Sequence, residues 1–385
     1  MRRETLLPGE ETSLGMWMMS FFVRTVTVFV LAATGLSAAP ISFWSHPGIV
    51  GDSMFFIKAD DAAAPKASLL RVPTDVPELR SCTQEVKYEM GRDFTWEPGT
   101  REIFLTANSR IPFKTLAELH PAPGSPYSYD GFRDTTLHML YSQGRFFHDL
   151  QCEASYTSKE AFPGPVPPAA AKELSRVRAR LLAKQPVKVV MLGDSISTGL
   201  NASLTGAAPP LLPGYPEQVA KILGERTGAP VTIKNLSVSG MGSGWGLQQM
   251  PAVIAEAPDL FLLAFGMNDA SGHDTPANFV NTLRKTLDAL HEGRPDCDAI
   301  VISPMTANSE WKHAVPELYP AYATEMKKLV GPGCALADVT AVWLALMEHK
   351  THLDLSGNGL NHPNDFGHRI YAEIVLATIG DLSKP

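Results

Sequence analysis

Ser195 stands in a short block, Gly193-Asp194-Ser195, whose residue types suit acyl transfer. It directly follows an apolar run and is expected to open a helix. A serine at that position combines a hydroxyl with outward-pointing backbone N–H groups and the positive end of a helix. Those features suit a nucleophile whose attack creates an oxyanion. The competing interpretation is an ordinary serine or aspartate cap, which is common at a helix start.

Three later blocks add groups that could complete such a site. Gly240 lies in the run NLSVSGMGSG at 235–244, where glycine lets backbone N–H groups approach a ligand closely. Asn268, in the sequence GMND at 266–269, has an amide that can donate to developing negative charge. His362 precedes Pro363 in a loop and is a candidate general base. Taken singly, each block is equally explained as a turn or a structural histidine.

The elements between the blocks form a repeating pattern of strands and helices. Five apolar runs predict strands at 187–192, 231–236, 260–265, 299–303 and 335–339. Helical periodicity predicts helices near 217–226, 247–257, 278–291, 321–330, 342–348 and 367–379. This alternation predicts a parallel sheet covered on both faces. The first three blocks follow its first three strands, at the carboxyl ends where reactive groups gather.

The four blocks together resemble the SGNH (GDSL-type) hydrolase family, from about residue 187 to the end of the sequence. The resemblance implies a flavodoxin-like three-layer α/β/α fold and hydrolysis of carboxylic esters through an acyl-serine intermediate. It implies that Ser195 is the nucleophile and His362 its base. The oxyanion hole is then formed by the backbone N–H groups of Ser195 and Gly240 with the side chain of Asn268.

One position departs from the family pattern. The family usually places an aspartate three residues before the histidine, and here that residue is Gly359. Asp354 is the candidate for the acid that orients His362, while a backbone carbonyl or a Ser–His dyad without an acid remain open alternatives. Asp194 and Asp269 are expected to brace their loops by accepting hydrogen bonds from backbone N–H groups.

The first part of the sequence has a different pattern of predicted secondary structure. Short strand-like segments between Ile41 and Thr157, separated by Pro, Gly, Asp and Asn, predict a smaller β-rich sandwich or jelly-roll domain. We expect a signal peptide at 1–38, the β-rich domain at 40–160 and the hydrolase domain at 185–385. A proline-rich linker, FPGPVPP at 162–168, and a capping helix at 169–184 make up the segment 161–184 between them.

The N-terminal segment carries the features of an export signal. Arg24 precedes an uncharged run at 25–38 that ends in small residues and is too short to span a bilayer. We therefore expect a secreted or periplasmic protein without stable membrane insertion after cleavage, the alternative being a retained anchor. In an oxidising compartment the four cysteines could form Cys82–Cys152 and Cys297–Cys334 bridges, or remain buried free thiols.

Composition and domain order limit the classes of substrate, cofactor and partner that we expect. The net charge of −7 argues against nucleic acid, and no nucleotide-binding loop or metal-ligand spacing is present, so neither a cofactor nor a metal is expected. A β-rich domain ahead of the hydrolase resembles two-domain carbohydrate esterases. That resemblance implies removal of O-acetyl groups from a glycan. The alternatives are a lipid esterase or lysophospholipase-like hydrolase, and a glycan-binding O-acyltransferase.

Overall fold

The structure is a computed structural model that describes residues 43–44 and 47–382. The signal peptide expected at 1–38 lies outside the described residues. The described residues group into one compact unit. Within the described ranges, no helix has both the length and the apolar character needed to cross a membrane.

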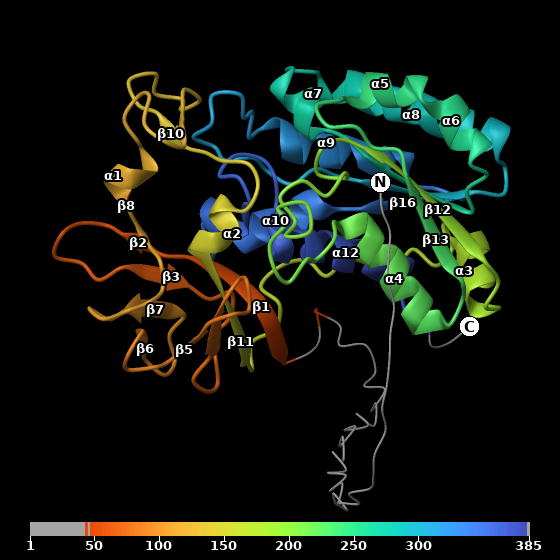
Figure 1. The fold of residues 1–385 in the computed structure, drawn as a ribbon. Coiled ribbons are helices and arrows are strands. Elements are labelled where there is room, and N and C mark those ends of the chain that lie inside the picture. The colour runs from red at the N-terminus through yellow and green to blue at the C-terminus, as the bar shows by residue number, and fades with distance from the viewer. Residues whose placement is uncertain (1–42, 45–46, 383–385) are drawn as a thin grey trace, which may run out of the picture. The chain divides into compact units, whose positions relative to one another are not determined.

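A five-stranded parallel sheet organises the second part of the chain (Figure 1). Its strands are β12 (Val187–Gly193), β13 (Val231–Asn235), β14 (Leu260–Ala264), β15 (Asp298–Ile302) and β16 (Cys334–Ala337). Their order, β13-β12-β14-β15-β16, is that of a flavodoxin-like sheet, and every neighbouring pair is parallel. All residues of β14 and β15 are buried, as strands covered on both faces require. The predicted fold class is confirmed.

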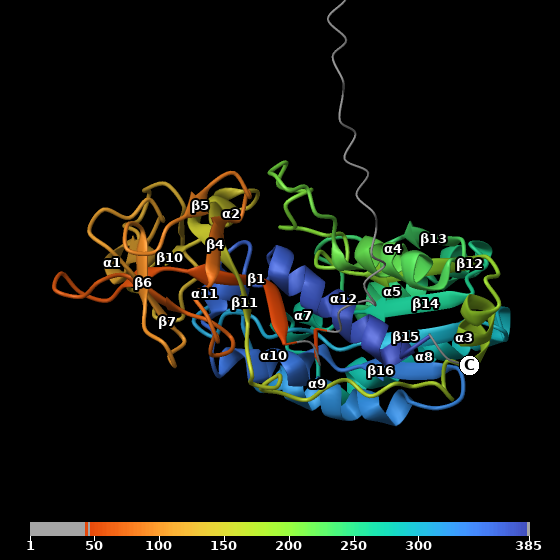
Figure 2. The ribbon, with the colours of Figure 1, turned by 90° about the horizontal axis from the view of Figure 1, so that it is seen from below.

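Helices cover both faces of this sheet. One face carries α4 (Tyr215–Thr227) and α12 (Asp365–Ile379), which pack against each other as seen in Figure 2. The other face carries α5 (Ser243–Gln248), α6 (Met250–Ala255), α8 (Pro276–Gly293) and α9 (Leu318–Met326) (Figure 1). The remaining helices are α3 (Ser175–Leu182), α7 (Met267–Ser271), η1 (Lys327–Leu329), α10 (Val339–Met347) and α11 (His352–Leu355).

The helix expected at 169–184 is shorter than its sequence pattern indicates. It begins only at Ser175, where a buried carboxylate fixes its first turn. Asp298 accepts the backbone N–H of Val177 at 2.9 Å and pairs with Arg176 at 3.1 Å. The carboxylate therefore satisfies a backbone donor that has no partner within the helix.

The first part of the chain is a small β sandwich. One sheet has the order β1-β11-β4-β5, and the other has the order β6-β7-β3-β2-β8. The strands are β1 (Gly48–Phe55), β2 (Ile57–Lys58), β3 (Lys66–Ser68), β4 (Glu78–Ser81), β5 (Lys87–Tyr88), β6 (Phe94–Trp96), β7 (Glu102–Leu105), β8 (Lys114–Thr115) and β11 (Gln151–Thr157). Met54 and Leu79 of the first sheet share one apolar core with Phe94 and Ile103 of the second. A two-stranded sheet, β9 (Ser128–Tyr129) and β10 (Met139–Leu140), and helices α1 (Leu116–Leu119) and α2 (Phe146–Leu150) complete this part.

Buried polar contacts join the sandwich to the segment ahead of α12. The ammonium of Lys350 lies 2.8 Å from a carboxylate oxygen of Asp52 on β1, and neither side chain is exposed. Nearby, the amide of Asn364 donates to the hydroxyl of Ser53 at 2.9 Å. His362 lies between these two contacts in the sequence, so the sandwich helps to hold the loop that carries it.

The cysteines do not form the two bridges considered from the sequence. All four are free and buried. Cys297 and Cys334 do lie at the same end of neighbouring strands, because Cys334 pairs in register with Ala299. Burial raises the pKa of both thiols to about 12, and it also raises the pKa of Cys82 and Cys152. The structure therefore supports the alternative of buried free thiols. Protonated thiols of this kind are unreactive.

Candidate active site

The loop after β12 brings Ser195 to His362. Strand β12 ends at Gly193, where a Cβ atom would lie 2.5 Å from the carbonyl oxygen of Ala264 on β14. Glycine therefore lets the ends of these two strands approach closely. In this arrangement the Oγ of Ser195 lies 2.9 Å from Nε2 of His362, and each residue is only 5% exposed. The structure thus juxtaposes a hydroxyl and a potential base from blocks far apart in the sequence.

The other ring nitrogen of His362 faces Asn201. Its Nδ1 lies 2.8 Å from Oδ1 of Asn201, while Nδ2 of the same asparagine donates to the carbonyl of Gly357 at 3.0 Å and to that of Gly144 at 3.4 Å. These donations assign the amide oxygen to the imidazole, so Nδ1–H is the donor. The lone pair on Nε2 is then directed at the Ser195 hydroxyl, which is the tautomer a general base requires.

Asn358 shapes the loop that carries His362. Its Oδ1 accepts backbone N–H groups from Leu360 at 2.9 Å, Asn361 at 3.0 Å and His362 at 3.2 Å. Its Nδ2 lies 3.1 Å from Nδ1 of His362, but that nitrogen already donates to Asn201 at a shorter distance. Asn358 consequently fixes the backbone of the loop rather than the proton of the ring.

Asp354 does not contact His362, which corrects the expectation that it orients the imidazole. Its Oδ1 accepts the backbone N–H of Phe55 on β1 at 2.7 Å. Its Oδ2 accepts the backbone N–H and the hydroxyl of Thr351 at 2.6 and 2.9 Å, closing a capping box on α11. Both oxygens therefore have structural partners, and Asn201 stands beside Nδ1 instead.

The packing of the β sandwich explains why no acid stands at position 359. Gly359 has a φ of +84°, and a Cβ there would lie 2.7 Å from both the carbonyl oxygen of Leu140 and the ring of Phe147. The sandwich side of the molecule occupies the space that an aspartate would need. The sequence offered no comparable sign of Asn201. In the structure this residue has a φ of +65°, a backbone conformation that asparagine tolerates better than most residue types.

The expected oxyanion donors lie at the ends of three adjacent strands. Ser195 follows β12, Gly240 lies in the loop after β13, and Asn268 follows β14. Among the described residues, the backbone N–H groups of Ser195 and Gly240 have no hydrogen-bond partner. The amide of Asn268 donates to the carbonyl of Met241 at 2.9 Å, which ties it to the Gly240 loop and leaves its second N–H available.

The structure confirms the bracing roles expected for Asp194 and Asp269. Asp194 accepts the backbone N–H of Ile196 at 2.9 Å. Asp269 accepts the backbone N–H groups of Ser243 at 2.8 Å and Gly266 at 2.9 Å, which links the loops after β13 and β14. These two carboxylates therefore hold the turns that present the candidate catalytic groups.

Burial sets the protonation states around the site. It lowers the pKa of His362 to about 4, with a smaller contribution from the neighbouring His368. The imidazole is therefore uncharged at neutral pH and can accept a proton. Burial also raises the pKa of Asp194 to about 7, opposed by the backbone N–H groups that it accepts.

Comparison with known proteins agrees with this geometry. Residues 191–370, which contain Ser195, Asn201 and His362, match the GDSL-like lipase/acylhydrolase family. This match covers the part of the chain that carries the candidate site. The GDSL-like region also resembles an arylesterase from Vibrio mimicus, with 27% identity over 147 residues, which is 38% of this chain and 70% of the relative. The protein is accordingly a carboxylic ester hydrolase.

Two solved esterase structures also match part of the chain. The two-domain esterase CEX, active on acetylated mannans and co-crystallised with mannopentaose, is 20% identical with a TM-score of 0.44, covering 58% of this chain and 57% of CEX. Axe2, an acetylxylan esterase from Geobacillus stearothermophilus, is 20% identical with a TM-score of 0.40, covering 51% of this chain and 96% of Axe2.

Proposed function

We propose that this GDSL-like hydrolase is an exported serine esterase that removes O-acetyl groups from carbohydrate. The observation that carries the catalytic part is the hydrogen-bonded series Ser195–His362–Asn201, with distances of 2.9 and 2.8 Å. Export rests on the signal-like segment at 1–38. Ester hydrolysis needs only a serine, a base and oxyanion donors, and this arrangement offers all three.

The geometry gives each group one task. Ser195 Oγ attacks the ester carbonyl carbon while Nε2 of His362 takes its proton. The resulting oxyanion accepts hydrogen bonds from the backbone N–H groups of Ser195 and Gly240 and from Asn268. The imidazolium then protonates the leaving alcohol, which departs and leaves an acyl-serine. Water attacks this intermediate with His362 again as base, releasing the acid and restoring the serine.

The carbohydrate assignment rests on the β sandwich. Leu140 and Phe147 contact Gly359 in the loop that carries His362. The sandwich part of the chain is therefore packed against the proposed site and is not joined to it through the linker alone. A substrate much longer than its acetyl group could contact both parts of the molecule while being cut. The order of the two parts resembles that of two-domain carbohydrate esterases, which act on such polymers.

One observation favours lipid esters as a second candidate. Leu204, Leu211 and Leu212 are exposed by 49%, 52% and 39% on the loop that follows Asn201. Leu204 and Leu212 are joined by a backbone hydrogen bond at 3.0 Å, so they lie on the same small surface. Exposed apolar side chains beside a reactive serine can receive an acyl chain.

The deciding experiment compares acyl donors. We expect wild-type protein to release acetate from acetylated xylo-oligosaccharides and from p-nitrophenyl acetate, and to act poorly on p-nitrophenyl palmitate and lysophosphatidylcholine. Ser195→Ala should reduce both acetyl activities by on the order of 10⁴-fold or more. Faster hydrolysis of the long-chain esters would favour the lipid candidate. Acetyl transfer to added free sugar, in place of acetate release, would favour the acyltransferase.

A further inference from the structure

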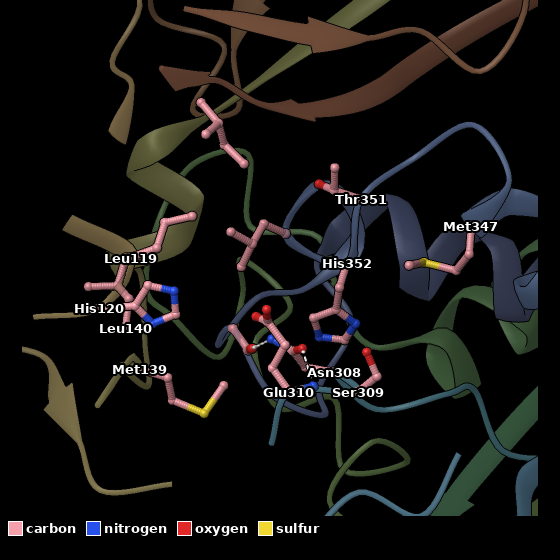
Figure 3. A pocket seen from close by; sticks show the side chains of 13 residues that line it. Leu119, His120, Met139, Leu140, Asn308, Ser309, Glu310, Met347, Thr351 and His352 are labelled. Atoms are coloured by element: carbon pink, nitrogen blue, oxygen red, sulfur yellow. Dashed lines mark hydrogen bonds between the residues drawn. The ribbon is translucent and has the colours of Figure 1, made fainter. Parts of the chain in front are cut away.

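A pocket lies between the β sandwich and the hydrolase, and Ser195 is not among the residues that line it. Its volume is about 290 Å³, near the lower end of the range for ligand sites. The apolar part of its wall comes from both sides of the molecule and consists of Ile57, Leu119, Met139, Leu140, Met347 and Leu353. Figure 3 shows His120 and His352 on opposite sides of this pocket.

His352 is the unusual member of the lining. It is only 9% exposed, and neither of its ring nitrogens makes a hydrogen bond of normal geometry, although the backbone of Leu360 lies near enough to interact with the ring. Burial lowers its pKa to about 4, opposed in part by the backbone of Leu360. The ring is therefore neutral at pH 7 and offers one donor and one acceptor. A backbone carbonyl such as that of Leu360 can accept only the ring N–H, so the acceptor nitrogen stays unpaired, and a donor that enters the pocket would be stabilised.

The other polar groups define what that partner must be. Nδ1 of His120 lies 3.1 Å from the carbonyl of His138 and donates to it, so Nε2 is the ring nitrogen that can pair with a ligand. Glu310 adds an exposed carboxylate and Ser309 a hydroxyl. The lining contains no lysine or arginine, which disfavours an anion. A ligand that donates to several acceptors, pairs with a neutral imidazole and covers apolar walls is an uncharged polyhydroxy compound.

We propose that this pocket is a subsite for one uncharged sugar residue of the glycan, and that His352 and Glu310 hydrogen-bond its hydroxyl groups. The inference rests on the proposed carbohydrate substrate. Gly359 lines the pocket and is three residues before His362, so their Cα atoms are at most about 11 Å apart. A glycan whose acetylated residue reaches Ser195 can therefore place a neighbouring residue in the pocket.

The test separates sugar binding from ester chemistry. His352→Leu and Glu310→Ala should raise KM for acetylated xylo-oligosaccharides about tenfold, equivalent to about 1.4 kcal/mol. Both should leave kcat/KM for p-nitrophenyl acetate unchanged, because that ester has no sugar to occupy the pocket. Glu310 is exposed, so its variant should fold even if His352→Leu does not. His291→Leu is the matched control, since Nε2 of this histidine is also buried without a partner but does not line the pocket.

Direct binding completes the test. Calorimetry with acetyl-free xylotetraose and mannotetraose should detect binding to Ser195→Ala that weakens when His352→Leu or Glu310→Ala is added. Acetate release that is unaffected by either variant, or no binding of either tetraose, would overturn the subsite. Binding that depends on His352 in a protein that releases no acetate from glycans would support the subsite and contradict the proposed reaction instead.

Discussion

The amide of Asn201 differs from a carboxylate in its effect on the base. A carboxylate beside Nδ1 would stabilise the imidazolium that forms when Ser195 gives up its proton. The amide oxygen offers only a dipole, so burial dominates and the pKa of His362 falls to about 4. The neutral, active form of the base therefore persists to a lower pH than in an unperturbed histidine.

This difference predicts the pH dependence of activity. For wild-type protein we expect kcat/KM on p-nitrophenyl acetate to stay nearly constant from pH 8 down to about 5. Asn201→Asp adds a negative charge beside the ring, which favours the protonated form. The acidic limb should therefore move upward by about 1–2 pH units. The measurement is the pH profile of kcat/KM between pH 4 and 9.

The control for this profile is Asn108→Asp, which adds the same charge at an exposed position in the β sandwich. It should leave the acidic limb where it is in wild-type protein. If Asn201→Asp also leaves the limb in place, Asn201 does not contact the base during catalysis.

Sequence and structure agree on the residues that follow strands and diverge on the residue that orients the histidine. Ser195, Gly240 and Asn268 could be located from the sequence because each lies in the turn or loop that follows an apolar strand. The partner of His362 could not, because the contact with Asn201 depends on the turn after Ser195 and on the loop built around Asn358. The glycine at position 359 could be explained only from the structure, because Leu140 and Phe147, which occupy the space beside it, come from a distant part of the sequence.

At the scale of elements, the stretch from α11 to the start of α12 acts as a support for His362. Asp354 caps α11, and Asn364 caps α12 by accepting the backbone N–H of Gly367 at 3.0 Å. The chain between them folds back, with the N–H of Gly357 donating to the carbonyl of His362 at 2.9 Å. Asp354, Asn358 and Asn364 each satisfy backbone N–H groups, so the imidazole position follows from local hydrogen bonds.

A substitution at Asp354 separates support from catalysis. Asp354→Ala removes acceptors for the buried N–H of Phe55 and for the capping box, and should lower the free energy of unfolding by about 1–3 kcal/mol. Its kcat at low temperature should stay within about threefold of wild type, whereas His362→Ala should be nearly inactive. Urea unfolding and initial rates measure the two effects. Loss of kcat comparable to that of His362→Ala, without loss of stability, would restore Asp354 to the mechanism.

The sequence predicted the strands of the parallel sheet to within about two residues, because buried parallel strands are continuous apolar runs. It was less successful where a local break interrupts a periodic pattern. The single helix expected near 247–257 is two short helices, α5 and α6, with Pro251 in the first turn of the second. Proline has no N–H to continue the preceding helix, and the chain restarts there.

At the scale of the whole molecule, a buried ion pair joins parts that are distant in the sequence. Asp52 faces Lys350 with one oxygen, and its other oxygen accepts the N–H of Leu70 and the hydroxyl of Tyr156, both at 2.7 Å. Lys350 also donates to the carbonyl of Ser68 at 2.6 Å. The sandwich and the segment that leads into α11 therefore share one polar cluster, and we expect the sandwich and the hydrolase to unfold together. No spacing in the sequence could indicate this pairing.

Substitution of the Asp52–Lys350 ion pair tests whether the sandwich and the hydrolase unfold together. Lys350→Met leaves the buried carboxylate of Asp52 without its counter-ion, which should lower stability by about 3–5 kcal/mol. Adding Asp52→Asn removes the unpaired charge and keeps an oxygen for Leu70 and Tyr156, so the double variant should recover part of that loss. The measurement is urea unfolding followed in parallel by fluorescence and by esterase rate.

If the sandwich supports the histidine loop, wild-type protein should show one transition in which activity and fluorescence are lost together. Lys350→Met should shift both curves to lower urea by the same amount, since the ion pair lies between the two parts and belongs to neither alone. Activity that persists in Lys350→Met after the sandwich has unfolded would show that the hydrolase holds His362 without it. In that case the β sandwich would serve substrate binding only, and the contacts made by Asp52 would be dispensable for catalysis.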